Sequence, residues 1–597
     1  MRPLAMLSKL LPGKFKITGT MDKKQTLELL KTMAKELPPN IYGNAVNMLK
    51  LEGEKHSYDR GFTLGVNDLA QFDKARNSIV NNLERRLKGA KTNADVSKLS
   101  GIYNKKIDEM LKKRLDNKDN PLYDMIASGA KGSATQLRSI MATPLMVTDA
   151  KGKIVPKPIR KSYTEGLDLE DYWTSMYGAR RGMMDRALQT SEPGAFSKDI
   201  MATTVDNVIS GEDCGTKEGV ILKVNDQDAL DRFLAGNQGP LAHNTLVDGK
   251  AVSTLQKAGF QTVKVRSPLR CLRPRGTCAK CYGLDEHGST PEIGDNVGAK
   301  AGQTIAEPMM QMTMNSFHTG GTAGSGGGYA RIKQILTMPK VVVGAATLAP
   351  MDGKVSAIKK GLAGGFDITV GTMTVHVSKG LNLKVKEGQT IEAGDPLSEG
   401  VIRPQDLVKH KGMHAAQEYI SKELQDAYKN QGIGISRKTF ETIVRSVGNT
   451  TKVMSSSPDH DHLPGDIIPY TVATDHNQNL TIKTTLANAV GRKLAEASAE
   501  FRVGHELEPK DIIILRSKGI NEVMIQKDPI VHAPVLKGIS TLPLLRRDWM
   551  AALGYRYLAK NLVEGAGQAW TTDLSDYHPI PAFAYGATFG KGKEGKY

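Results

Sequence analysis

The chain has 597 residues, of which 39% are hydrophobic and 24% charged, a balance that excludes a disordered protein and a membrane-embedded one. It is too long for a single hydrophobic core, so we expect several domains. The formal net charge of +18 favours a partner that carries phosphates, such as nucleic acid, because neutralising a polyanion releases its counterions; a solubilising surface is the alternative.

Helical patterns dominate the first third of the chain. Residues 1–120 carry apolar residues three and four apart among charged segments, which predicts amphipathic helices arranged as an antiparallel hairpin. Within 123–147, a short loop rich in Gly and Ser runs into helix-like sequence. Residues 162–205 predict one long helix, which Pro193-Gly194 should kink or interrupt.

The remainder alternates between helical and β-rich segments. A helix is predicted over 297–319, followed by Gly320-Gly321 and a flexible Gly/Ser tract. Between 340 and 400, short β-rich runs separated by Gly-containing turns predict strands. Residues 402–447 return to helix, 465–540 are mixed, and 541–565 form a last helix before a tail. The sequence shows no evident internal repeat.

The four cysteines of the chain predict a metal site. Three of them cluster, since Cys271 precedes the Cys-x-x-Cys knuckle of Cys278 and Cys281, and Cys214 lies more than fifty residues upstream. Thiolates suit Zn²⁺, and a closed tetrahedral site needs four of them. A redox Cys-x-x-Cys is the rival, but it would leave two cysteines idle. We expect structural zinc, its thiolate charge offset by nearby cations: Arg270, Arg273, Arg275 and Lys280.

A second candidate site lies on the helix predicted near residue 311. Gln311, Met314, Asn315 and His318 are spaced i, i+3, i+4 and i+7, so a helix places them on one face. Pro308 suits the first turn of such a helix. The face offers an amide for ribose, a thioether for a base and an imidazole for phosphates. The alternative is that the methionines of this segment are core, as is usual in a Met-rich helix.

Several blocks, collinear along the chain, resemble the C-terminal portion of the largest subunit of multisubunit, DNA-dependent RNA polymerases. GFTLGVNDL (61–69) resembles the secondary-channel funnel, DMIASGAKGSATQLRSI the F-loop, and YGARRGMMDRALQTSEPGAFSKDIM (177–201) the bridge helix. GAKAGQTIAEPMMQMTMNSFHTGG (298–321) is similar to the trigger loop. EDCGT with the three later cysteines resembles the second zinc site of bacterial β′, and GMHAAQEYISKELQDAYKNQGIGISRKTFETIVR its clamp and switch region.

This resemblance implies a mixed α+β, multidomain β′ C-terminal architecture with a long bridge helix, mobile trigger-loop helices, a zinc-bearing module, a small β-barrel-like domain and C-terminal clamp helices. The implied segments are a funnel-like helical region 1–120, F-loop 121–150, bridge helix 160–206, zinc-binding module 207–290, trigger loop 291–339, β-rich domain 340–400, clamp and switch helices 401–455, mixed region 456–540, and C-terminal helix and tail 541–597.

The resemblance also implies residue roles. Gln311 and Asn315 would contact ribose, Met314 would pack on the incoming base, and His318 would lie by the β-phosphate as a proton donor or a positive charge. Asn315 stands where the bacterial pattern has Arg and the archaeal and eukaryotic pattern has Asn. Implied nucleic-acid contacts are Arg180, Thr190 and Ser191 in the bridge helix and Lys131 and Arg138 in the F-loop. Pro193 and Asp199 depart from the family pattern.

The implied function is nucleotide addition and translocation by a polymerase subunit that is active only in a complex. The family's Mg²⁺-binding signature, Asn-Ala-Asp-Phe-Asp-Gly-Asp, does not occur in the chain, so the catalytic Mg²⁺ would be held by a partner. The cluster around Asp459 and His462 has the composition of a solvated loop. Implied partners are an N-terminal β′-type subunit, β-type subunits, a promoter-specificity factor, template DNA, product RNA and nucleoside triphosphates, with no membrane.

The start at Met1 near the funnel predicts a genetically split subunit. Its short length favours a large bacteriophage as the source, with the protein in the cytoplasm of the infected bacterium or packaged in the virion. Two alternatives stay open: a stand-alone, non-catalytic zinc protein that binds nucleic acid, and a decoy that assembles with a host RNA polymerase.

Overall fold

The fold is that of a computed structural model, which describes residues 11–586 apart from 13–14, 16–20, 22, 70–71, 91–92, 116–119, 150–153, 189–190, 318–326, 343, 363, 432, 461, 546–547, 556–557, 573, 575–577 and 585. The chain forms two compact units, Met1–Thr190 with Thr313–Gly327, and Ser191–Met312 with Gly328–Tyr597. The first unit is built of helices, and the described strands lie in the second, so the predicted mixed α+β, multidomain class is confirmed.

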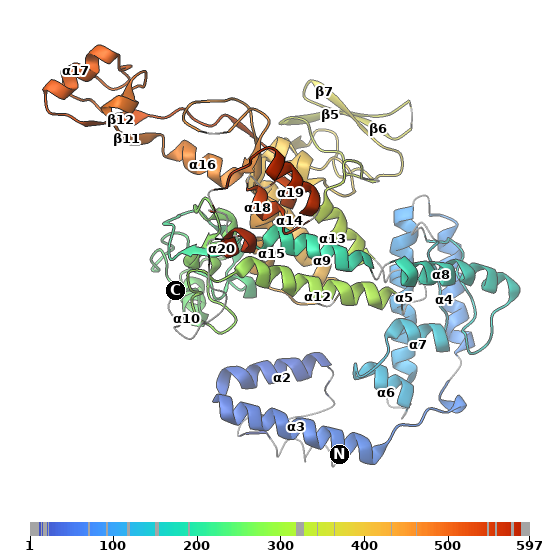
Figure 1. The fold of residues 1–597 in the computed structure, drawn as a ribbon. Helices are drawn as coiled ribbons and strands as arrows, with labels where there is room; N and C mark the ends of the chain where they lie inside the picture. Colours follow the sequence, from blue (N-terminus) through green and yellow to red (C-terminus); the bar gives the residue numbers. More distant parts are fainter. Residues whose placement is uncertain are drawn as a thin grey trace. The chain divides into compact units, whose positions relative to one another are not determined.

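The first unit is organised around two antiparallel helices, α4 (Asp73–Leu87) and α5 (Asn93–Leu115), which lie side by side in Figure 1. Leu83 and Ile107 are buried between them, and the Tyr103 hydroxyl donates to Asn82 Oδ1 at 2.7 Å. The predicted hairpin is therefore found at this pair. The unit's other elements are α2 (Lys23–Glu36), α3 (Pro39–Arg60), η1 (Val66–Asp68), α6 (Pro121–Ala127), α7 (Ala134–Met141) and α8 (Leu169–Leu188).

The single helix predicted over 162–205 is wrong at its start. The helix α8 begins only at Leu169, because the preceding residues are tied into a turn: the Tyr163 amide donates to the Ser139 carbonyl at 3.0 Å and the Lys161 ammonium to Asp168 at 2.7 Å. A second helix, α9, spans Ser191–Thr204. Pro193 lies in the described part of α9, and residues 189–190, between α8 and α9, lie outside the described residues.

The second unit pairs α9 with α12 (Val297–Phe317), and small residues set their close approach. A Cβ built on Gly298 would lie 1.9 Å from the Thr204 carbonyl oxygen, and one on Gly302 would lie 2.9 Å from Met201 Sδ. Larger residues would therefore push the two helices apart. Pro308 lies inside α12 and not in a first turn, so that prediction is corrected.

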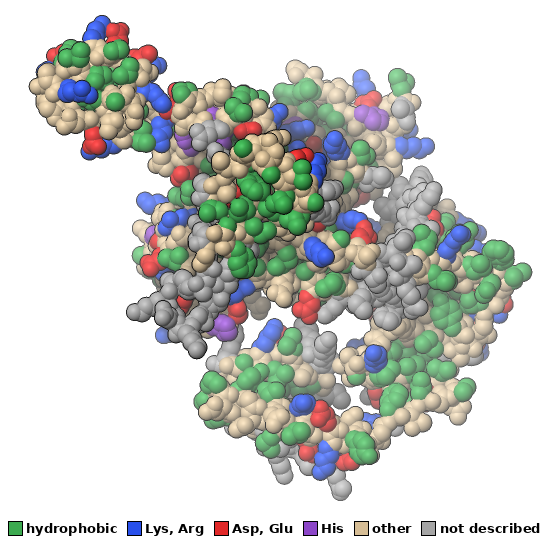
Figure 2. All heavy atoms as spheres, in the orientation of Figure 1, with side chains coloured by type: hydrophobic (Ala, Val, Ile, Leu, Met, Phe, Trp, Pro, Cys, Tyr) green, Lys and Arg blue, Asp and Glu red, His purple; other side chains and the backbone are tan. Residues whose placement is uncertain are grey.

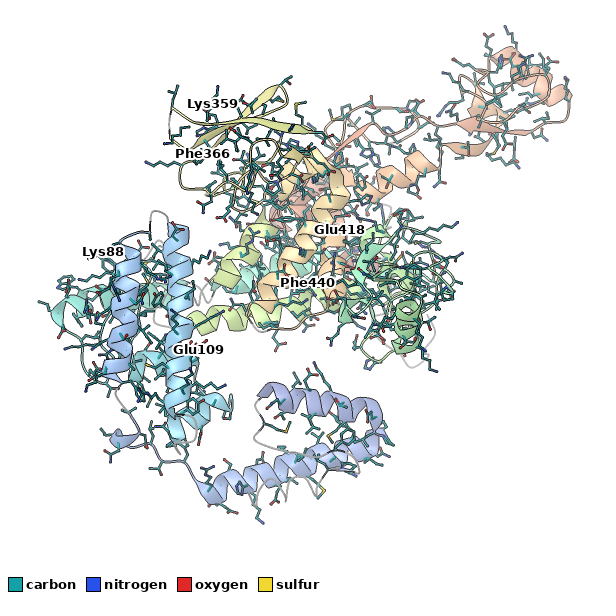
Figure 3. All side chains as sticks on the ribbon, turned by 180° about the vertical axis from the view of Figure 1, so that it is seen from behind. Lys88, Glu109, Lys359, Phe366, Glu418 and Phe440 are labelled. Atoms are coloured by element: carbon teal, nitrogen blue, oxygen red, sulfur yellow. The ribbon has the colours of Figure 1, made fainter. Side chains whose placement is uncertain are left out.

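The largest core joins these helices to α13 (Gly327–Thr337), α14 (Pro404–Lys429) and α15 (Arg437–Val447). Phe440 of α15, labelled in Figure 3, lies with its ring centroid 5.3 Å from that of Tyr428 on α14. The Tyr428 hydroxyl donates to the Ile305 carbonyl of α12 at 2.7 Å. This one side chain therefore connects α14, α15 and α12.

A separate core underlies an antiparallel sheet in the order β7-β6-β5-β8, formed by Met373–Val377, Phe366–Val370, Gly353–Lys360 and Thr390–Ile391. In the described residues β7 and β8 are edge strands, so barrel-like closure is not confirmed. Farther along lie β9 (Thr450–Val453), β10 (Ile467–Pro469), α16 (Tyr470–Gln478), β13 (His532–Pro534), η5 (Leu542–Leu545), α18 (Trp549–Ala552), α19 (Leu558–Gly567) and α20 (Pro579–Ala584).

The second unit contains the same small fold twice, which corrects the expectation of no internal repeat. The first copy, module A (220–266), has the order β2 (Val220–Lys223), η2 (Gln227–Ala229), α10 (Gly249–Lys257) and β3 (Thr262–Val265). The second, module B (480–526), has β11 (Thr481–Thr485), η4 (Leu486–Ala489), α17 (Pro509–Ser517) and β12 (Glu522–Gln526). Both helices and both last strands are offset by 260 residues.

The isolated bridges inside the modules repeat at the same offset, whereas the first strand pairs two residues farther along in module B, with Ile482 opposite Ile525 where module A has Val220 opposite Val265. The isolated bridges Phe233–Leu246, Leu234–Val265 and Gln238–Leu241 recur as Lys493–Glu506, Leu494–Ile525 and Ser498–Phe501. Backbone at Asp231 and Asn244 is left-handed, as it is at Gly491 and Gly504. Only nine positions between 220 and 267 carry the residue found 260 positions later, among them the buried Leu234, Leu255 and Val263. Shared core positions therefore specify the shared fold.

Leu255 and Leu515 occupy equivalent, fully buried positions and provide a matched test of the repeat. We expect Leu255→Ala and Leu515→Ala each to destabilise its own module by about 2–5 kcal/mol, because each leaves a cavity. Hydrogen exchange in the full chain should then accelerate over 480–526 in Leu515→Ala, and over 220–266 and the neighbouring cysteines in Leu255→Ala. Acceleration over both modules in either variant would contradict their independence.

Candidate metal centre

The four cysteines come together, as their spacing predicts. Their Sγ atoms all lie within 4.8 Å of one another, Cys214 and Cys281 are 3.6 Å apart, and none of the four forms a disulfide. A tetrahedral zinc with Zn–S bonds near 2.3 Å separates its sulfurs by about 3.8 Å. The thiol quartet therefore fits a structural zinc ion, although the identity of the metal stays a prediction.

Short, irregular elements carry the ligands. Cys214 follows β1 (Ile209–Gly211), Cys271 follows η3 (Pro268–Arg270), and Cys278 and Cys281 lie in β4 (Thr277–Cys278) and α11 (Ala279–Tyr282). Parallel pairing of β1 with β4 brings the distant Cys214 to the knuckle. The Cys278 amide donates to Cys271 Sγ at 3.3 Å and the Cys281 amide to Cys278 Sγ at 3.4 Å. Such donors stabilise thiolates.

One arginine, missed from the sequence, lies against the sulfurs. Arg266 Nη2 is 3.3 Å from the Sγ atoms of Cys214 and Cys281 and 3.5 Å from that of Cys278. Its Nη1 lies 2.6 Å from Asp213 Oδ1 and donates to Asn244 Oδ1, also at 2.6 Å. Arg266 is completely buried at the end of module A.

Three of the four cations predicted to offset the thiolates have other partners. Arg270 pairs with Glu418 of α14 at 2.5 Å, and the Lys280 ammonium lies 3.9 Å from the centroid of the Phe233 ring. Arg273 donates to the Asp213 carbonyl at 3.4 Å. The prediction for these three cations is therefore corrected. The cation in contact with the sulfurs is Arg266, which lies five residues before Cys271 and belongs to no sequence motif.

The four thiols differ in how readily they lose a proton. Hydrogen bonds from the thiols of Cys271, Cys278 and Cys281 lower the pKa of Cys214, whereas burial raises the pKa of Cys281. Burial also opposes the charge of Arg266, but Cys281 and Asp213 outweigh it, so the pKa of this guanidinium is raised. Arg266 therefore stays a cation, and the pKa is lowered for two thiols of the quartet, Cys214 and Cys271, the latter to about 7.

A buried carboxylate attaches this region to the helical core. Glu441 of α15 accepts from Arg232 Nη1 at 2.6 Å, Ser267 Oγ at 2.8 Å and Arg437 Nε at 3.0 Å. The Glu441 side chain is fully buried and that of Arg232 is 2% exposed. Module A thus contributes one arginine to the cysteines and another to α15.

The comparisons with known proteins match most of the chain. The family model described as RNA polymerase Rpb1, domain 5, matches residues 166–361 and 349–522, and that described as RNA polymerase Rpb1, domain 4, matches 71–153. The chain belongs to the RNA polymerase Rpb1 (β′) family. It corresponds to a C-terminal portion of the β′ subunit.

Several bacterial β′ subunits are similar to this family member. The DNA-directed RNA polymerase subunit β′ of Moorella thermoacetica is 31% identical over 483 residues, which covers 75% of this chain and 41% of the relative. Those of Caldanaerobacter subterraneus and Desulforamulus reducens are 31% and 29% identical, covering 80% and 92% of this chain and 43% and 46% of the relatives. The chain thus spans less than half the length of these relatives.

The remaining predicted site residues of this β′ portion are only partly described. Thr190 and His318 lie outside the described residues, as do the side chains of Gln311, Met314 and Asn315, although α12 includes all three positions. Lys131, Arg180 and Ser191 are exposed. Arg138 is buried, and its Nη1 donates to both carboxylate oxygens of Asp108 at 2.8 and 3.0 Å. Burial raises the pKa of Asp108 and Arg138 opposes this shift.

The loop near residue 460 is exposed on both sides of the Asp/His cluster, at Ser456, Pro458 and 463–466, but the Asp459 side chain is not solvated. The Asp459 side chain is 7% exposed and forms an ion pair with Arg492 of module B. Asp459 Oδ2 also accepts from the Asp528 amide at 2.6 Å. In the described residues, which omit Asp461, the four cysteines are the only cluster with metal-ligand spacing.

Removing the charge of Glu441 should loosen the attachment of module A. We expect Glu441→Gln to lower the free energy of unfolding of the full chain by about 3–5 kcal/mol, because the buried Arg232 and the partly buried Arg437 lose their carboxylate. The control is Glu218, whose ion pair with Lys264 is exposed. Glu218→Gln should change the free energy of unfolding by less than about 1 kcal/mol. Urea unfolding measures the free energy of unfolding of both variants. Equal losses in Glu441→Gln and Glu218→Gln would refute the claim that the buried ion pair contributes more than the exposed one.

Proposed function

We propose that this chain supplies the bridge helix and trigger loop of a multisubunit DNA-directed RNA polymerase, and so acts in nucleotide addition and translocation. The observation that carries the proposal is the ordered match to Rpb1 domains 4 and 5 over 71–153 and 166–522. The net charge of +18 supports template DNA and product RNA as ligands. The relatives reported above are bacterial, and a phage source stays a prediction.

The pairing of α9 with α12 supports this assignment. The contacts at Gly298 and Gly302 fix the first half of α12, and the same helix continues through Gln311 and Met314 toward His318. In the proposal, the 311–318 face closes on a nucleoside triphosphate. Amide groups contact ribose, Met314 packs on the base, and His318 lies by the phosphates. Closure excludes water and favours the correct substrate.

Template contacts are proposed for α8 and the F-loop segment. Arg180 on α8, Ser191 at the start of α9, and Lys131 are exposed and suited to phosphates or bases, and Thr190 is proposed with them. Arg138, by its pair with Asp108, is better suited to fixing α7 on α5 than to touching the template. The proposed small β-rich domain and clamp helices correspond to 340–400 and 401–455.

Exposed apolar side chains support partner subunits. Tyr172, Trp173 and Tyr177 of α8 are each more than half exposed, and Figure 2 shows hydrophobic side chains gathered over α19, where Leu558, Leu562 and Val563 are exposed. Contiguous apolar surface of this kind marks interaction sites. The proposed partners are an N-terminal β′-type subunit, β-type subunits and a promoter-specificity factor. No described helix is long and apolar enough to cross a membrane.

Metal ions have two proposed roles. Zinc held by Cys214, Cys271, Cys278 and Cys281 would join segments that are distant in the chain, which is a structural role. The catalytic Mg²⁺ is proposed to lie on the N-terminal β′-type partner, because this chain has no Asn-Ala-Asp-Phe-Asp-Gly-Asp string.

The decisive test is assembly followed by nucleotide addition. The tagged chain should co-purify with subunits that mass spectrometry identifies as polymerase components. In that complex, His318→Ala should slow single-nucleotide addition by about 10- to 100-fold, because a positioned group near the phosphates is lost. His410→Ala, which alters an exposed histidine of α14, should leave the rate unchanged. A complex that assembles but adds no nucleotides would favour the decoy.

Metal analysis tests the cysteine assignment separately. We expect one zinc per purified chain, and Cys278→Ser to reduce that content because one of four ligands is lost. Removing the metal with a chelator should expose the thiols to alkylation. It should also weaken assembly, because the ion no longer joins the segments that carry the four cysteines. Full assembly by metal-free chains would contradict a structural role.

A further inference from the structure

We propose that Arg266 is a positioning residue for the metal, a buried cation that caps one face of the sulfur tetrahedron and raises metal affinity. The inference rests on the zinc assignment of the proposed function. It concerns a residue that touches three of the four sulfurs and belongs to neither the Cys-x-x-Cys knuckle nor the remaining pair of ligands.

The geometry suits a face-capping cation. A single nitrogen, Nη2, is within 3.5 Å of the sulfurs of Cys214, Cys278 and Cys281, so it lies outside the face that these three atoms form. Asp213 and Asn244 hold Nη1 at 2.6 Å, which fixes the plane of the guanidinium. Cys271, the fourth ligand, accepts instead from the Cys278 amide.

The electrostatics follow from the burial. Four thiolates and a divalent ion leave two negative charges in a region where Cys271, Cys278 and Cys281 are buried. Uncompensated charge is strongly disfavoured in a buried site. One cation in contact with the sulfurs balances one of the two excess negative charges.

The internal repeat separates this role from the needs of the fold. Module B keeps an arginine, Arg492, at the position of Arg232, but has Gln526 at the position of Arg266 and Gly504 at that of Asn244. Module B also has no cysteine. The same β-turn-helix-β fold thus forms without an arginine at this position. The arginine and the asparagine that orients it occur in the copy that adjoins the sulfurs.

The test is zinc affinity of the full chain, measured by competition with a chromophoric chelator. Arg266→Gln, which installs the residue found in module B, should lower zinc affinity by about 10- to 100-fold, the usual effect of losing a group behind a metal ligand. Arg232→Gln is the matched control, because Arg232 is an equally buried arginine of the same module that pairs with Glu441 and not with sulfur. It should stay within about twofold of the unchanged chain.

The outcomes are distinct. Unchanged zinc affinity in Arg266→Gln would overturn the proposal, because Arg266 would then have no effect on the metal. An equal loss of affinity in Arg232→Gln would also overturn it, because the loss would then come from general destabilisation of module A. If Arg266→Gln does not fold, Arg266→Lys decides: an ammonium lacks the second nitrogen by which Asp213 and Asn244 hold the guanidinium in place, so affinity should fall about tenfold, and unchanged affinity would refute the positioning role. Absence of zinc from the unaltered chain would instead refute the metal assignment, whereas inactivity of a zinc-loaded complex would refute only the polymerase role.

Discussion

Burial of charge is the constraint on which the second unit depends. Three of the four cysteines and the carboxylate of Glu441 are buried from water, so their negative charge needs cations within the protein. Module A supplies both cations: Arg266 lies against the sulfurs and Arg232 against Glu441. Because the two arginines project from one small rigid fold, the position of the metal cluster is linked to that of α15. Packing of Phe440 and Tyr428 then extends the link to α14 and α12.

Sequence reasoning predicted the parts of this arrangement that chemistry or periodicity restricts tightly. Four soft ligands with a Cys-x-x-Cys knuckle have few alternatives to a metal site, so the gathering of Cys214 with Cys271, Cys278 and Cys281 was predictable. Apolar periodicity likewise predicted α12 and α14. Arg266 was not predictable, because an arginine at a strand end carries no motif and acquires its role only when β1 and β4 pair. Charge near Cys271 in sequence favoured Arg270, which instead reaches across to Glu418.

The errors in the predicted fold have similar causes. The start of α8 was predicted too early because tertiary hydrogen bonds to Ser139, which periodicity does not report, hold Tyr163 in a turn. The repeat was overlooked because a small α/β fold tolerates most substitutions that preserve buried volume, and only nine of its positions are identical. What the copies share is a pattern of buried side chains and left-handed turns. Polar residues outside that pattern differ between the copies. They distinguish module A, which adjoins the cysteines, from module B, which pairs with Asp459.

The contact between α9 and α12 relates this scaffold to the proposed chemistry. A helix that closes on a nucleotide needs one end held firmly, so that the position of its other end is determined by substrate and not by drift of the whole element. Gly298 and Gly302 provide the firm end by letting α12 touch the backbone of α9, while Thr203 and Asn207 at the end of α9 bond to the Ile539 and Thr442 carbonyls. Asn207 also accepts from Thr277, the neighbour of a metal ligand. The cysteine cluster is therefore joined through Asn207 to the end of α9, the helix against which the first half of α12 packs.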